Sequence, residues 1–196
     1  MTFINRRNLF ALGAAGAGIL AAPRVLRAQT RSIADTLASD TRFQRLMDLI
    51  VRNSMVDTFR QPGPFTVFAP TAQAFLSAPA GILNDLVGNQ ESGNNQGDRE
   101  RDRLGALINY HVVNGRFMAE ELMGQNRNVN TVNGGALQLS STGGGALTVR
   151  NPAPAVQLGA TGAAGAQTSF RPANVTQANI PATNGVIHAI DQGLFP

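Results

Sequence analysis

Two histidines are the only imidazole groups in this chain of 196 residues, and each could in principle do chemistry. His188 lies in the apolar segment NGVIHAID, three residues before Asp191, so a catalytic pair or half of a metal site is one reading. In a strand, side chains alternate between the two faces, which groups His188 with Val186 and Ile190 and turns Asp191 away. We therefore expect His188 to be a buried residue whose ring nitrogens bond to backbone groups, with a ligand or switch role as the alternative.

His111 follows the single tyrosine, Tyr110, at the end of the predicted helix RDRLGALINY. A metal site would need both histidines together with distant carboxylates, and the chain has neither cysteine nor a zinc signature. Serine and threonine occur without a Gly-x-Ser-x-Gly context or a suitably spaced histidine. The sequence therefore predicts a protein that is not an enzyme, with no catalytic residue, no metal and no cofactor.

The first 28 residues have the pattern of an export signal. Arg6 and Arg7 precede a mild apolar run from Leu9 to Ala22, and Ala28 offers a small residue for cleavage. The paired arginines indicate the twin-arginine type of signal peptide. An uncleaved anchor is the alternative, but a run of roughly 14 apolar residues is short of the ~20 that a spanning helix needs. We expect a protein exported to the periplasm, the cell surface or the medium, with no membrane span after cleavage.

The charge distribution argues against nucleic acid as a partner. All 16 basic residues are arginine, and four of them precede residue 29, whereas all 12 acidic residues follow it. The part that remains after cleavage is nearly neutral and has no basic stripe.

The remaining chain is predicted to fold as one α+β domain over residues 32–196. Apolar spacing predicts helices at 32–38 and 40–55, at 79–87 and at 101–110, with a polar loop at 89–103 whose last residues begin the last of these helices. FTVFAP at 65–70 is a predicted strand, and Thr71 is placed to cap the short helix that follows. After a short helix closed by Gly124, glycine-rich turns predict antiparallel hairpins, and two strands flank Asn184 near the end. The segment 151–170 is rich in alanine, glycine and proline and is predicted to leave the core.

Three segments, in this order, resemble the signatures of the fasciclin domain family: FTVFAPTAQAF at 65–75, LINYHVV at 107–113, and NGVIHAIDQGLFP at 184–196. The resemblance implies a wedge of antiparallel sheet with the N-terminal helices packed along one side, usually secreted and engaged in adhesion. It also implies a scaffold or recognition role for Tyr110 and His111, with the Tyr110 hydroxyl bonding across the sheet edge.

The resemblance also locates a candidate recognition element. The acidic–hydrophobic dipeptide of adhesive animal members corresponds to Asn179 and Ile180, where an amide replaces the carboxylate. We expect residues 177–181 to form an exposed loop that binds integrin-type receptors weakly or not at all, because hard cations prefer an anionic oxygen. The sequence thus predicts contacts with an unknown protein or cell-surface partner. A carrier for a small hydrophobic ligand of the carotenoid type is the alternative.

Overall fold

The computed structural model describes residues 31–78, 96–141, 146–152 and 171–195 of the chain. The predicted signal peptide, the predicted helix at 79–87 and most of the segment 151–170 lie outside these residues.

Residues 31–78 contain five short helices, and three of them follow a short polar residue. They are α1 (Ile33–Ser39), η1 (Thr41–Phe43), α2 (Gln44–Arg52), η2 (Thr58–Arg60) and α3 (Ala72–Leu76). The Ser32, Asp40 and Thr71 side chains each accept a hydrogen bond from a backbone N–H of the helix that follows, which satisfies a donor that the helix itself cannot pair. Two later helices are α5 (Gln96–Tyr110) and α6 (Ala119–Leu122). The segment 89–103 was expected to be a loop whose last residues begin the helix at 101; this was wrong for residues 96–100, because α5 already begins at Gln96.

Seven strands form one sheet in the order β2-β1-β7-β6-β5-β4-β3. Their bounds are β1 (Phe65–Pro70), β2 (Val112–Asn114), β3 (Arg127–Asn130), β4 (Ala136–Ser141), β5 (Leu147–Arg150), β6 (Ala173–Ala182) and β7 (Gly185–Ile190). The outer strands β2 and β3 approach each other through the Val113–Thr131 bridge and a 2.8 Å hydrogen bond from Val132 N to Val112 O, so the sheet nearly closes.

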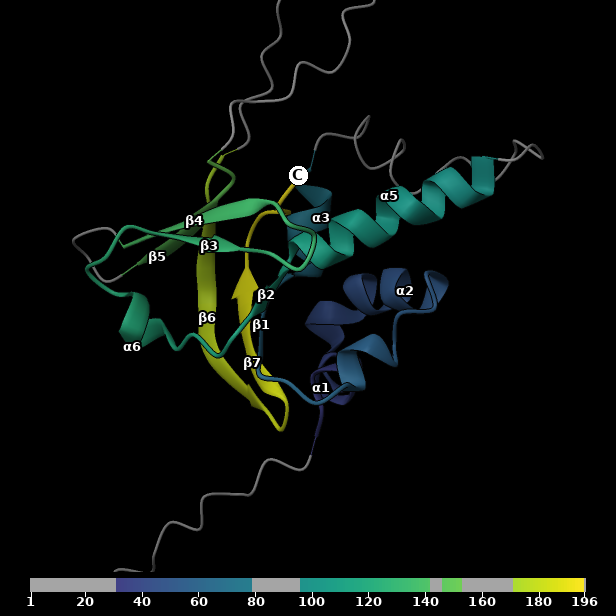
Figure 1. Cartoon of the computed structure of the whole chain (residues 1–196), viewed down its shortest axis with the longest axis horizontal. Helices are drawn as coiled ribbons and strands as arrows, with labels where there is room; N and C mark the ends of the chain where they lie inside the picture. The colour runs from purple at the N-terminus through teal and green to yellow at the C-terminus, as the bar shows by residue number, and fades with distance from the viewer. Residues whose placement is uncertain (1–30, 79–95, 142–145, 153–170, 196) are drawn as a thin grey trace, which may run out of the picture.

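The α+β fold is confirmed, with the N-terminal helices gathered along one side of the sheet (Figure 1). The sheet is mixed instead of antiparallel throughout, because β1 and β7 run parallel, with Phe65 opposite Gly185 and Pro70 opposite Ile190. The predicted hairpins β3–β4 and β4–β5 are antiparallel, as expected.

Strands β1 and β7 are covered on both faces, which explains their nearly continuous apolar sequences. Val67 and Ile187 point into a helix-side core shared with α1, α2 and α5. Phe68 and Ile190 point into a sheet-side core shared with β3, β4 and β5. Any polar side chain on these two strands is therefore buried and must find its hydrogen-bond partners within the protein.

Candidate recognition site

Strand β6 carries the candidate dipeptide on a bulge. The β6–β7 register shifts twice, between Val175 and Gln177 and again between Gln177 and Ile180. Asn179 lies in the second shift with a φ of 58°, a left-handed conformation that asparagine adopts more readily than most residues. The expected exposed loop at 177–181 is thus wrong, because these residues belong to the bulged strand.

The side chain of Asn179 connects this bulge to α6. Its Oδ1 accepts a 2.9 Å hydrogen bond from the first N–H of the helix, at Ala119, and its Nδ2 donates to both carboxylate oxygens of Glu120, at 2.8 and 3.0 Å. Ile180, the second residue of the dipeptide, is half-buried against the helix-side core. An aspartate at position 179 would lose both bonds to Glu120 and face its negative charge, so the local structure favours the amide.

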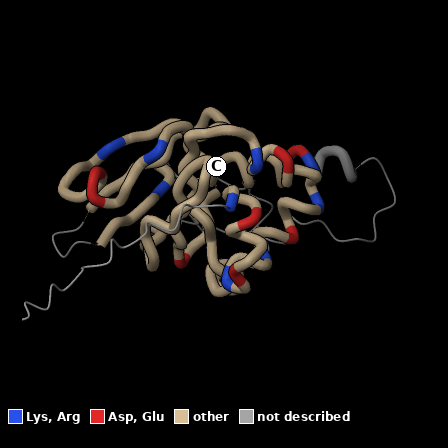
Figure 2. Tube along the Cα trace, turned by 90° about the horizontal axis from the view of Figure 1, so that it is seen from below, with Lys and Arg blue, Asp and Glu red and all other residues tan. Residues whose placement is uncertain are grey.

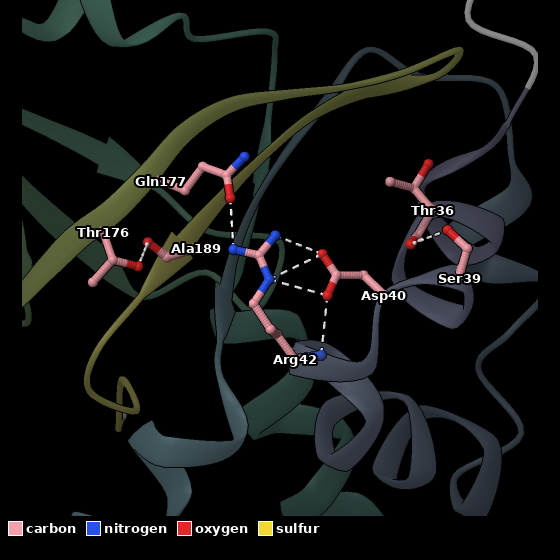
Figure 3. Close-up of polar contacts among 7 residues, drawn as sticks. All are labelled: Thr36, Ser39, Asp40, Arg42, Thr176, Gln177 and Ala189. Carbon is pink, nitrogen blue, oxygen red and sulfur yellow. Dashed lines mark hydrogen bonds and ion pairs between the residues drawn. The ribbon is translucent and has the colours of Figure 1, made fainter.

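On the other side of the bulge, the side chain of Gln177 contacts η1. Arg42 of η1 donates from Nη1 to Gln177 Oε1 at 2.6 Å, while its Nε and Nη2 hold the carboxylate of Asp40 (Figure 3). The hydrogen bonds from Arg42 lower the pKa of the Asp40 carboxyl group. Since Arg42 is about half exposed, with 47% of its side chain accessible, this contact fixes the geometry more than it adds stability.

His188 lies directly beneath the bulge and uses both ring nitrogens. Nε2 donates to the carbonyl oxygen of Phe117 at 2.8 Å, and Nδ1 accepts from the backbone N–H of Asn179 at 3.3 Å. The ring stacks on Phe68, with centroids 5.5 Å apart. Burial lowers the pKa of His188, against smaller opposing effects of the Phe117 carbonyl and of Glu120. This pattern describes a neutral imidazole with its proton on Nε2.

His111 has the opposite proton arrangement at the end of α5. Nδ1 donates to the carbonyl oxygen of Leu107 at 2.8 Å, and Nε2 accepts from the backbone N–H of Leu194 at 3.0 Å. Complete burial lowers its pKa to about 4, although the bond to Leu107 acts in the opposite direction. The neutral ring therefore joins the end of α5 to the chain after β7.

Tyr110 crosses to the far side of the sheet, where its hydroxyl donates to the carbonyl oxygen of Ala136 at 2.8 Å. Burial raises the pKa of Tyr110 to about 12, so the hydroxyl remains a donor. A Cβ at Gly135 would lie 2.6 Å from the tyrosine ring, and Gly134 has a φ of +84°. The two glycines of the NGG turn thus differ in role: Gly134 permits the turn conformation, and Gly135 leaves space for the ring of Tyr110.

Asp191, the other member of the candidate pair with His188, does not contact the imidazole. Asp191 accepts hydrogen bonds from the backbone N–H and the side-chain amide of Asn174, both at 2.7 Å. Each histidine nitrogen has a backbone partner instead. In the described part of the chain, no three histidine, aspartate or glutamate side chains are grouped in a way that could hold a metal ion.

Asn184, which the sequence predicts only as part of a turn, has a central position in the structure. Asn184 is 8% exposed, and its Oδ1 accepts from Ile33 N at 2.9 Å. Its Nδ2 donates to the carbonyl oxygens of Phe59 and Gln61, at 2.9 and 2.7 Å. An Asn-Gly pair between two strands predicts a turn, and no sequence pattern distinguishes a turn asparagine from one that also holds three distant segments together.

The surface around the site is of mixed charge. Arginine and carboxylate positions are interspersed along the described elements instead of gathering by sign (Figure 2). None of the helices that the structure describes combines the length and apolar character needed to cross a membrane. A mixed surface of this kind suits neutral polar contacts better than binding to a polyanion.

Comparison with known proteins agrees with this geometry. A model of the fasciclin domain matches residues 41–196. The chain is 31% identical over 160 residues to the uncharacterized protein sll1735 of Synechocystis, covering 82% of this chain and 94% of that protein. It is also 31% identical over 176 residues to the rabbit (Oryctolagus cuniculus) transforming growth factor-beta-induced protein ig-h3, covering 88% of this chain but 20% of the relative.

Among solved structures, the FAS1 domain pair of the insect cell adhesion molecule fasciclin I has the same fold. The TM-score is 0.59 at 13% identity, over 86% of this chain and 52% of the other. The sheet with its helices on one side, and a family match that extends over most of the sequence, lead to one conclusion: the chain belongs to the fasciclin domain family.

Proposed function

We propose that this protein is an exported, non-enzymatic fasciclin domain that makes protein–protein contacts at the cell surface or in the periplasm, through the bulged part of β6. Relatives support the class of function, since the fold neighbour is described as a cell adhesion molecule and ig-h3 shares 31% of its residues over the matched region. Each of the two histidines already has both ring nitrogens bonded to backbone groups, which leaves neither available as a general base.

The observation that carries the proposal is the edge of β6 that has no strand partner beyond Asn174 among the residues described. Strand β5 pairs with β6 only at Ala173 and Asn174, so residues 175–182 have no strand on that side among the residues described. Unpaired backbone groups at a strand edge can bind an extended segment of another protein. The bulge and Pro181 interrupt this edge, which limits unspecific pairing and leaves a short, defined contact.

Site-specific crosslinking tests this assignment. A photoreactive residue at the exposed position Gln177 is expected to capture an envelope or surface protein of the source cell, whereas the same residue at the exposed position Val51 of α2 is not. Contact should persist in EDTA, because Asn179 lacks the carboxylate that completes a cation site. Equal crosslinking at both positions, or none at Gln177 in intact cells, contradicts a contact surface on β6.

Export by the twin-arginine route is the second part of the proposal. Changing Arg6 and Arg7 together to lysine is expected to retain the protein in the cytoplasm, because lysine keeps the charge but lacks the planar guanidinium. Fractionation followed by immunoblotting measures the change, with single-lysine variants as partial controls. Normal amounts of the double-lysine protein outside the cytoplasm would show that another route is used.

A further inference from the structure

A cavity of about 180 Å³ lies between the helical region and the edge of the sheet, and no residue of β6 is among its lining residues that the structure describes. Its walls come from the start of α1, from η2, and from strands β1 and β2. The apolar wall residues are Ile33, Phe59, Phe65, Val67, Val112 and Val132. Val132 is 42% exposed at the rim, so the cavity opens to solvent beside it.

Among the residues that the structure describes, no charged side chain lines this cavity. Transfer of an ionised group from water into such surroundings without a partner is strongly unfavourable. The occupant that suits these walls is therefore uncharged.

Four polar side chains complete the lining: those of Thr58, Gln61, Asn109 and Asn114. None of the four makes a side-chain hydrogen bond to another residue that the structure describes, and Asn109 is half-buried. An apolar cavity with a few available polar groups is the usual form of a small-molecule site, in which the polar groups orient the ligand. A ligand with one hydroxyl or amide group would satisfy them.

The volume limits the size of the ligand. Sites for drug-sized molecules occupy roughly 300–1,000 Å³, whereas an apolar cavity of about 150 Å³ is sufficient for benzene. Phe59 and Phe65 are among the lining residues, and aromatic rings pair favourably with one another. A long polyene would not be enclosed by these walls.

We propose that the cavity beside η2 binds a small uncharged aromatic molecule, a single ring that carries a hydroxyl or amide group. The ring of the ligand fills the space between Phe59, Phe65 and Val112. Its hydroxyl or amide group forms hydrogen bonds with Asn109 and the other polar lining residues. The site is independent of the β6 contact surface proposed above.

Titration of the protein with benzamide, followed by amide resonances in NMR, tests the proposal. Saturable shifts are expected at Val112 and Val132, and benzoate, which has the same ring with a charge, should bind at least tenfold more weakly. Asn109→Ala should weaken the binding of benzamide several-fold and leave that of toluene unchanged.

A matched pair of variants separates the cavity from general effects. Val132→Trp should reduce benzamide affinity at least tenfold by filling the rim. Val51→Trp, at an exposed residue that does not line the cavity, should leave affinity unchanged. Circular dichroism verifies that both variants fold. Shifts that do not saturate, benzoate binding as tightly as benzamide, or equal losses in the two tryptophan variants would overturn the assignment.

Discussion

Acidification from pH 7 to pH 4 is expected to lower the free energy of unfolding by about 3 kcal/mol through His111 alone, with a further loss through His188. Burial lowers the pKa of His111 from 6.5 to about 4 and also lowers the pKa of His188. Protons therefore bind the unfolded chain before they bind the folded one. The stabilisation is fully present above pH 6.5 and is lost as the pH falls toward 4.

Urea unfolding at half-unit steps of pH measures this effect. Each histidine that stays neutral in the folded protein adds a slope of about 1.4 kcal/mol per pH unit below 6.5. The imidazole C–H resonances of the folded protein give an independent control, since that of His111 should not titrate above pH 5. A free energy of unfolding that stays constant between pH 7 and pH 5 would contradict the neutral, buried state of both rings.

Replacement of Asn184 by alanine is expected to lower the free energy of unfolding by about 3 kcal/mol. The change removes three hydrogen bonds and leaves the N–H of Ile33 without its acceptor in a buried position. Each lost bond contributes on the order of 1 kcal/mol, and an unsatisfied buried group adds more. Thermal or urea unfolding at pH 7 gives the value.

Two further variants show whether the side chain acts through these bonds. Asn184→Asp keeps the acceptor for Ile33 but places a carboxylate against the carbonyl oxygens of Phe59 and Gln61, so it should destabilise at least as much as alanine. Asn128→Ala, at an exposed position on β3, should change stability by less than about 0.5 kcal/mol. If Asn184→Ala behaves like Asn128→Ala, the three bonds do not contribute as described.

Local signals predicted most of the elements of this fold and few of its long-range contacts. Thr71 after a run of β-formers predicted a helix cap, and the NGG turn predicted the β3–β4 hairpin, because both depend on neighbouring residues. The parallel pairing of β1 with β7 joins segments more than a hundred residues apart, and no periodicity encodes such a partner. The start of α5 was predicted at residue 101 and lies at Gln96, because the residues before 101 are polar and lack an apolar stripe.

At the candidate site, too, local features could be predicted from the sequence and long-range contacts could not. The alternation of a strand correctly separated His188 from Asp191, since that argument needs only neighbouring residues. The bond between Asn179 and Glu120 could not be found in this way, because it depends on a bulge that places β6 against a helix residue 59 positions earlier in the chain.

The position of β7 in the sheet has a consequence for biosynthesis. Translation produces β7 after the other six strands, yet it lies between β1 and β6. Until residues 185–190 have left the ribosome, β1 lacks its long partner, and Val67 and Ala69 lack the neighbours Ile187 and Ala189 that complete the helix-side core. The earlier strands cannot form the finished sheet by themselves. Most of the chain therefore stays incompletely folded and accessible to chaperones and proteases until β7 has been made. A product of premature termination before residue 185 never obtains the joining strand, and degradation of such products requires no signal other than their failure to fold.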